Sequence, residues 1–128
     1  MVFQVTALYA SILAIAAIVL SIIVSVKRGK AGVAIMDGGN TDLALWIRKH
    51  GNFIENVPFA LFLMALAEAR GMPVTWLNAI GILLLVARLI HVIGLKADKP
   101  AEPLRVSGAV GTHISMLGAV AFLLWSMH

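Results

Sequence analysis

The sequence predicts an all-α integral membrane protein in which four transmembrane helices form one up-down bundle. Hydrophobic residues make up 61% of the 128-residue chain and charged residues only 12%, whereas a soluble domain averages about 45–50% and about 25%. The apolar residues are gathered in four runs, each close to the roughly 20 residues that cross a bilayer core. The length allows a single domain, and we expect residues 1–128 to form it.

The four predicted spans cover residues of about 2–26, 43–69, 74–95 and 106–127. The first span lacks the basic start of a signal peptide and exceeds the roughly 7–15-residue apolar core of one, so we expect it to be retained. The second span contains Pro58, which is expected to bend the helix. The remaining two spans are uninterrupted by proline.

Three connections join the predicted spans. The first, residues 27–42, contains four glycines and is expected to be irregular. The second, residues 70–73, is a tight turn in which Pro73 suits the first turn of the next helix. The third, residues 96–104, contains two prolines and cannot continue a helix. Connections this short make consecutive helices antiparallel, which predicts the up-down order.

Basic residues are concentrated beside the first and third connections, whereas the second connection carries only Arg70. The basic residues on the richer side are Lys27, Arg28, Lys30, Arg48, Lys49, Lys96, Lys99 and Arg105. The positive-inside rule therefore predicts that both longer connections are cytoplasmic and both termini outside. The net charge of +4 then reflects orientation and an anionic ligand, and no nucleic-acid partner is expected.

A polar group interrupts the second span. Arg48, Asn52 and Glu55 follow one another at i, i+4 and i+7, which places them on one helix face. Counting 1.5 Å per residue places Arg88 of the third span at a depth comparable to that of Glu55, with His91 one turn nearer the surface. We expect Glu55 and Arg88 to pair or to face one ligand. Ionisable groups inside a membrane are usually paired or functional.

Purely structural roles for the same residues remain open. Arg48 and Lys49 would also serve as interfacial anchors, and Glu55 with Arg88 would also serve as a structural ion pair. His113, close to several small residues of the fourth span, is expected to pack between helices. No two histidines have the spacing of a metal-ligand pair, so no metal is expected.

The chain contains no cysteine. Its side chains therefore supply no disulfide, no thiolate metal ligand and no thiol nucleophile. If thiol chemistry takes place here, a substrate or cosubstrate brings the sulfur. The cationic groups are expected to converge on one end of the bundle with Glu55 and Asn52 among them, an arrangement that suits a small ligand with several carboxylates and one amine. These cationic groups are Lys27, Arg28, Arg48, Arg88 and Arg105.

The segment Arg48-Lys49-His50-Gly51-Asn52-Phe53-Ile54-Glu55-Asn56-Val57-Pro58 resembles the Arg-x-x-x-Asn-x-x-Glu-x-x-Pro signature of the MAPEG family. These are the membrane-associated proteins in eicosanoid and glutathione metabolism. Three shorter segments, residues 37–39, 87–91 and 104–108, are similar to the bacterial branch of that family. The resemblance covers essentially the whole chain.

The resemblance implies a homotrimer of four-helix subunits in a bacterial inner membrane, with glutathione as cosubstrate between neighbouring subunits near the cytoplasmic ends. The residues implied to bind glutathione are Arg28, Arg48, Asn52, Glu55, Arg88 and His91. Glu55 would receive the amino group of glutathione, and the arginines would receive its carboxylates. Arg105 stands at the position of the arginine that stabilises the thiolate, which makes it the implied catalytic residue.

The function implied is that of a membrane-bound glutathione transferase, with glutathione peroxidase as a further activity of the same thiolate. Its second substrate would be a lipophilic electrophile or lipid arriving from the bilayer. One alternative is a non-catalytic membrane protein of the same fold that binds a lipid or another anionic ligand. Asn56 and Leu95 keep that alternative open because some relatives have tyrosines there. A small transporter is a second alternative, although the first span has no acidic residue of the kind such transporters use.

Overall fold

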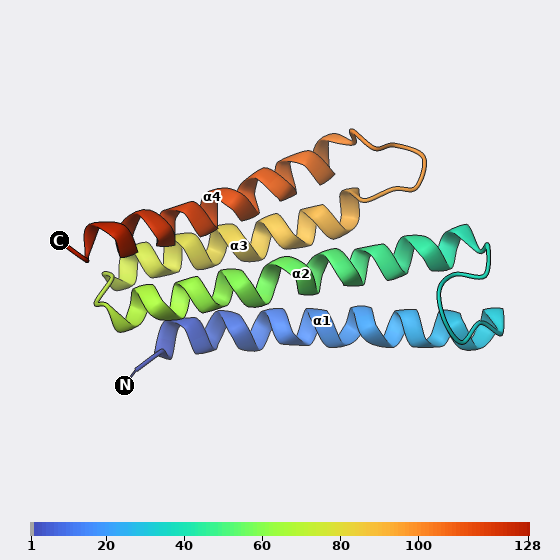
Figure 1. Ribbon diagram of the computed structural model, residues 1–128, viewed down its shortest axis with the longest axis horizontal. Coiled ribbons are helices and arrows are strands. Elements are labelled where there is room, and N and C mark those ends of the chain that lie inside the picture. Colours follow the sequence, from blue (N-terminus) through green and yellow to red (C-terminus); the bar gives the residue numbers. More distant parts are fainter. Residues whose placement is uncertain (1) are drawn as a thin grey trace.

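The computed structural model describes residues 2–128, and these residues form four antiparallel helices (Figure 1). The helices are α1 (Gln4–Ala31), α2 (Thr41–Ala69), α3 (Val74–Gly94) and α4 (Pro103–Trp125). All four are long and apolar enough to cross a membrane, which confirms the prediction of four spans. The two chain termini and the α2–α3 turn lie at one end of the bundle, hereafter the terminal end. The two longer connections lie at the other, hereafter the loop end.

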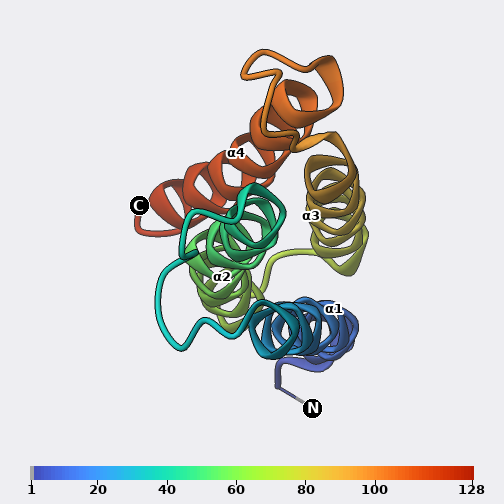
Figure 2. The same cartoon turned by 90° about the vertical axis from the view of Figure 1, so that its right-hand side faces the viewer.

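The helices are arranged with α2 and α3 between α1 and α4, as the end view in Figure 2 shows. Helix α1 packs on α2 and α3, and helix α4 packs on α3 and α2. Within residues 2–128 the backbones of α1 and α4 do not come into contact. The α2–α3 hairpin is therefore the centre of the chain, and the site described below lies along it.

Helix α1 extends five residues beyond the predicted end of the first span. It continues through Lys27, Arg28 and Lys30 to Ala31, so the prediction that the first connection begins at Lys27 was wrong. Basic residues are favoured in the last turn of a helix because they face its negative dipole end. The helix ends at Gly32, whose φ of 66° is left-handed and whose N–H donates to carbonyls of the preceding turn.

Helix α4 begins at Pro103, three residues before the predicted start of the fourth span. Proline is well tolerated at the first helical position because no backbone N–H is needed there. The side chain of Glu102 caps the helix, since its Oε2 accepts the N–H of Arg105 at 3.1 Å. Pro73 precedes α3 as its N-cap and does not lie inside its first turn as predicted. The third span ends at Gly94, one residue earlier than expected.

Helices α3 and α4 approach each other closely at glycines. A Cβ at Gly108 would lie 2.6 Å from the Cβ of His91 and 2.7 Å from the carbonyl oxygen of Ala87. A Cβ at Gly111 would lie 2.9 Å from the Cβ of Ala87. Small residues let membrane helices pack with their backbones near one another. This packing fixes the α3 segment that carries Arg88 and His91 against α4.

Candidate functional site

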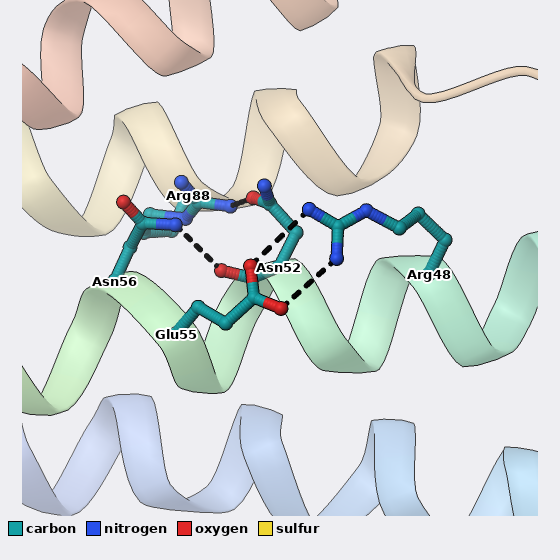
Figure 3. A network of polar contacts seen from close by, with 5 residues as sticks. All are labelled: Arg48, Asn52, Glu55, Asn56 and Arg88. Carbon is teal, nitrogen blue, oxygen red and sulfur yellow. Dashed lines mark hydrogen bonds and ion pairs between the residues drawn. The ribbon is translucent and has the colours of Figure 1, made fainter.

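Arg48 and Glu55 form a bidentate ion pair on one face of α2 (Figure 3). The Nη1 and Nη2 atoms of Arg48 donate to Oε1 and Oε2 of Glu55 at 3.0 and 3.2 Å. Seven residues of helix turn through about 700°, so the two side chains project almost in line, two turns apart. In the single chain both are exposed, with relative side-chain accessibilities of 54% and 57%.

Arg88 pairs with Asn52 and not with Glu55. Its Nη2 donates to Oδ1 of Asn52, one turn from Glu55 toward the loop end (Figure 3). The first of the two expected arrangements, a Glu55–Arg88 pair, was therefore wrong, because the partner of Arg88 lies one turn away at Asn52. That both side chains face one ligand stays a prediction. Asn52 faces α3, whereas Glu55 is rotated by about 60° from it around α2 and reaches Arg48 instead.

The guanidinium of Arg88 is buried, with a relative accessibility of 1%. Besides Asn52, its Nη1 donates to Oγ1 of Thr112 on α4 at 3.3 Å, and its Nη2 lies 3.1 Å from Nδ1 of His91. Because a guanidinium can only donate, Nδ1 of His91 is the acceptor in this contact. These partners are all neutral, and within residues 2–128 no carboxylate pairs with Arg88.

Two further residues belong to this polar network and were not predicted as site residues. The side-chain amide of Asn56 donates to the backbone carbonyl of Asn52 at 2.8 Å (Figure 3). Thr112 accepts from Arg88 and donates to the carbonyl of Gly108 at 2.8 Å. The sequence held a signal for each. Asn56 follows Asn52 by four residues. Thr112 lies nine residues after the start of α4 and Arg88 six residues before the end of α3, so the two positions fall within about one helical turn of the same depth.

Arg28 and Arg105 lie at the loop end but contact the connections and not the Arg88 network. Arg28 donates from Nη1 to the carbonyl of Met36 in the first connection. Arg105, half-buried in the first turn of α4, donates from Nη1 to the carbonyl of Pro100 at 2.9 Å. Within one chain, then, the structure brings Asn52, Arg88 and His91 into contact and leaves these two arginines apart from them.

Two predictions about histidine and metal concern the rest of the chain. His113 is exposed on α4, so the expectation that it packs between the helices of the bundle was wrong for the single chain. Its neighbours Thr112 and Ser115 carry the buried polar contacts of α4 instead. Across residues 2–128, no three His, Cys, Asp or Glu side chains gather in a group that could hold a metal ion.

The arrangement has a definite chemical preference. Arg88 is a buried cation with neutral partners, and Arg48 beside it is an exposed cation whose guanidinium can grip a carboxylate through two parallel hydrogen bonds. Glu55 offers a carboxylate to an ammonium group, and Asn52 offers an amide between them. Such a set of groups is suited to a small zwitterionic ligand with an excess of negative charge.

Comparison with known proteins agrees with this architecture. Residues 6–125 match the MAPEG family. The chain is 36% identical over 124 residues to the Escherichia coli K12 protein "Inner membrane protein YecN". The alignment covers 97% of this chain and 93% of that protein. The protein of the same name from Escherichia coli O6:H1 strain CFT073 matches equally well. No solved structure matches the chain significantly. This four-helix membrane protein therefore belongs to the MAPEG family.

Proposed function

We propose that this protein is a membrane-bound glutathione transferase that binds glutathione at the Arg48–Asn52–Glu55 face of α2, between neighbouring copies of the chain. The observation that carries the proposal is the position of Glu55. It lies thirteen residues, or about 20 Å, along α2 from Glu68 at the terminal end. A bilayer core is about 30 Å thick, so an exposed carboxylate at this depth would face hydrocarbon unless something polar covers it.

Glutathione satisfies the groups that this face presents. Glu55 would accept hydrogen bonds from its amino group, while Arg48 would exchange part of its bond to Glu55 for a glutathione carboxylate. Arg88 holds the amide of Asn52 from behind and adds a positive potential without contacting solvent. A second copy of the chain would close the face from the other side, which is why we propose a homotrimer as the assembly.

The proposed chemistry requires only that the thiol lose its proton. A free thiol has a pKa near 8.5 and reacts as the thiolate. Arg105 lies apart from the Asn52–Arg88 network within one chain, so we propose that it reaches the bound sulfur across the contact between neighbouring copies. Its guanidinium stays charged when partly buried and would stabilise the thiolate. The sulfur would then form a bond to an electrophilic carbon of a lipophilic substrate. In a substitution a leaving group would depart from that carbon with its electron pair, and in an addition the adduct would take up a proton. Reduction of a lipid hydroperoxide would use the same thiolate and a second glutathione.

A titration of the purified protein with glutathione in detergent at neutral pH tests this function. We expect saturable binding and a rise of thiolate absorbance at a pH where free glutathione is mostly thiol. S-Methylglutathione is the matched ligand, because it should bind without producing that absorbance. Binding without thiolate would favour a non-catalytic protein of this fold. Absence of binding at millimolar glutathione would overturn the proposal.

We also propose that the loop end faces the cytoplasm of a bacterial inner membrane. The loop end carries nearly all the lysine and arginine residues, whereas the terminal end carries Arg70. The name of the Escherichia coli relative agrees with this membrane. Since the chain has no cysteine, a single cysteine can replace Ala97 at the loop end or Gly71 at the terminal end, and each would report the side of the membrane on which its end lies. A membrane-impermeant maleimide added to intact spheroplasts should label only the cysteine at position 71.

A further inference from the structure

An apolar groove of about 310 Å³ runs between α1 and α3, away from the proposed glutathione site. Ala16, Val19 and Ile23 of α1 form one wall and Ile93 of α3 lies on the other. Trp46 and Phe53 of α2 form part of the lining. On α1, Val19 and Ile23 are spaced by one helical turn, so the groove follows the helix axis. We name it the Trp46 groove.

Two lysines meet at the tryptophan of this groove. The Nζ of Lys49 lies 4.6 Å from the centre of the Trp46 ring, and the Nζ of Lys27 lies 5.6 Å from it. Both distances suit cation–π contacts. Asp42 forms an ion pair with Lys27. Lys49 forms no ion pair among residues 2–128, and the nearby carboxylate of Asp42 is shared between the two lysines, so this cluster keeps an excess of positive charge.

The groove and the proposed glutathione site occupy different faces of α2. Trp46, Lys49 and Phe53 follow at i, i+3 and i+7, which places them on one side of the helix. Arg48 and Glu55 project more than 100° away from that side. In Figure 2, α1 and α3 lie together on one side of α2. The groove can therefore be filled while the Arg48–Glu55 face is covered by another copy of the chain.

The groove also has a polar end and an apolar end. Trp46 lies five residues after the start of α2, and Ile93 lies next to the last residue of α3, so both are at the loop end. Ala16 and Phe53 lie about two turns deeper in the bundle. Tryptophan and lysine are typical of the membrane–water interface, where a lysine places its ammonium at the level of the lipid headgroups. The deeper lining is hydrocarbon.

We propose that the Trp46 groove binds an anionic phospholipid of the surrounding bilayer. One acyl chain lies along α1 and α3, and the headgroup phosphate lies beside Lys49 and Lys27. The apolar lining matches the acyl chain, and the ammonium of Lys49, which forms no ion pair among residues 2–128, matches the phosphate. A second copy of this protein fits the groove less well, because packing against it would remove the ammonium of Lys49 from water without supplying an anion.

The test uses tryptophan fluorescence in proteoliposomes. Replacing the two exposed tryptophans at the terminal end (W76F and W125F) leaves Trp46 as the single reporter. Phosphatidylglycerol and phosphatidylcholine carrying the same brominated acyl chains are compared as quenchers. We expect half-maximal quenching at an about fivefold lower fraction of brominated phosphatidylglycerol, which is the selectivity that one lysine near the surface provides.

Three variants locate the binding. Lys49→Gln should lose most of the about fivefold preference. Lys30→Gln is the matched control, because Lys30 is also a lysine at the loop end, is exposed and does not contact Trp46. This variant should keep the preference. Ala16→Phe should fill the groove and reduce quenching by both lipids. Helicity and elution volume show whether each variant is folded.

Three results would overturn the proposal. Equal quenching by the two lipids would show that the groove does not select a headgroup. Absence of quenching by either lipid would show that protein covers the groove. Equal losses in Lys49→Gln and Lys30→Gln would assign the preference to the general charge of the loop end. The comparison of the two lipids needs no substitution at the groove, so it decides the question even if Ala16→Phe does not fold.

Discussion

The two ends of the bundle use charged side chains in different ways. At the terminal end, Glu68 accepts the backbone N–H groups of Val5 and Thr6 at 2.9 and 2.8 Å. These are free N–H groups in the first turn of α1, where the helix dipole favours an anion. Arg70 donates to the carbonyl and the hydroxyl oxygen of Ser126, at the C-terminal end of α4. Each charge is matched to a helix end.

At the loop end the charged groups are matched to one another only in part. Arg88 is buried among neutral partners, and the Arg48–Glu55 pair is exposed in the single chain. The comparison teaches that charges at both ends complete the fold, since Glu102 caps α4 and Lys27 pairs with Asp42 at the loop end. Arg88 and the Arg48–Glu55 pair are different, because they lie along the α2–α3 hairpin and are the charges that we expect to meet a ligand. Substitutions at the terminal end and along this hairpin should therefore separate stability from binding.

The largest effect is expected for Arg105→Ala, which should lower the yield of bound thiolate and the turnover at least about 100-fold, as loss of one stabilising donor does in other active sites. The folded protein should keep its helicity and its elution volume in detergent. Arg70→Ala is the control at the terminal end and should keep thiolate formation. Turnover by Arg105→Ala at the wild-type rate would remove Arg105 from the mechanism.

Gly108→Ala should be more destabilising than Gly118→Ala in the same helix. Its new methyl group would meet backbone atoms of Ala87 and His91 at 2.7 Å, and overpacking of this kind costs about 1–3 kcal/mol. Gly118→Ala, toward the terminal end of the same helix, would meet only the Cγ2 of Ile80 at 3.1 Å and should change stability by less than about 1 kcal/mol. Unfolding in a titration with sodium dodecyl sulfate, followed by circular dichroism, measures both. Equal effects would show that α3 and α4 pack no more tightly at the loop end.

Glu68→Gln and Glu55→Gln form a matched pair, one at the terminal end and the other at the middle of α2. Glu68→Gln should lower the free energy of unfolding by about 1–2 kcal/mol, because it weakens charge-assisted hydrogen bonds at a helix N-terminus, and should leave glutathione binding unchanged. Glu55→Gln should weaken glutathione binding roughly tenfold and leave the unfolding transition in place. Calorimetric titration and thermal unfolding of both variants measure the contrast. The reverse pattern would contradict this division of roles.

Thr112→Val should have the smallest effect, a loss of about 1 kcal/mol of stability with a few-fold loss of glutathione affinity. Valine keeps the shape of threonine but removes the oxygen that Nη1 of Arg88 contacts at 3.3 Å. Thr75→Val, an exposed position near the start of α3, should be neutral within about 0.5 kcal/mol. A loss of stability without any loss of affinity would make the Arg88 network purely structural.

Most of the fold could be predicted from hydropathy, because a bilayer leaves a chain of this composition few options other than helices. The ends of the helices were harder to predict from the sequence, since α1 continues through Lys27–Lys30 after its apolar run has ended. The capping groups, Gly32 and Glu102, set the true boundaries. Hydropathy reports the membrane, whereas backbone hydrogen bonding decides where a helix stops.

The candidate site could be predicted from the spacing of Arg48, Asn52 and Glu55, but the hydrogen-bond partner of Arg88 could not. Helical periodicity determines which residues share a face of α2, so the Arg48–Glu55 alignment follows from the sequence. The partner of Arg88 depends on how α3 is rotated against α2 and α4, and close packing at Gly108 and Gly111 sets that rotation. A one-turn difference separated Glu55 from the actual partner, Asn52.

The contacts between the helices group them into two pairs. Helices α1 and α2 are joined at both ends, by Glu68 at one and by the Lys27–Asp42 pair at the other, while α3 and α4 are locked through their glycines. The two pairs are not separate units, because α1 also packs on α3 and α4 also packs on α2. The Asn52–Arg88 bond is the polar contact between the pairs at the level of the site. A ligand that took the oxygen of Asn52 would remove this one bond and leave the packing contacts between the two pairs in place.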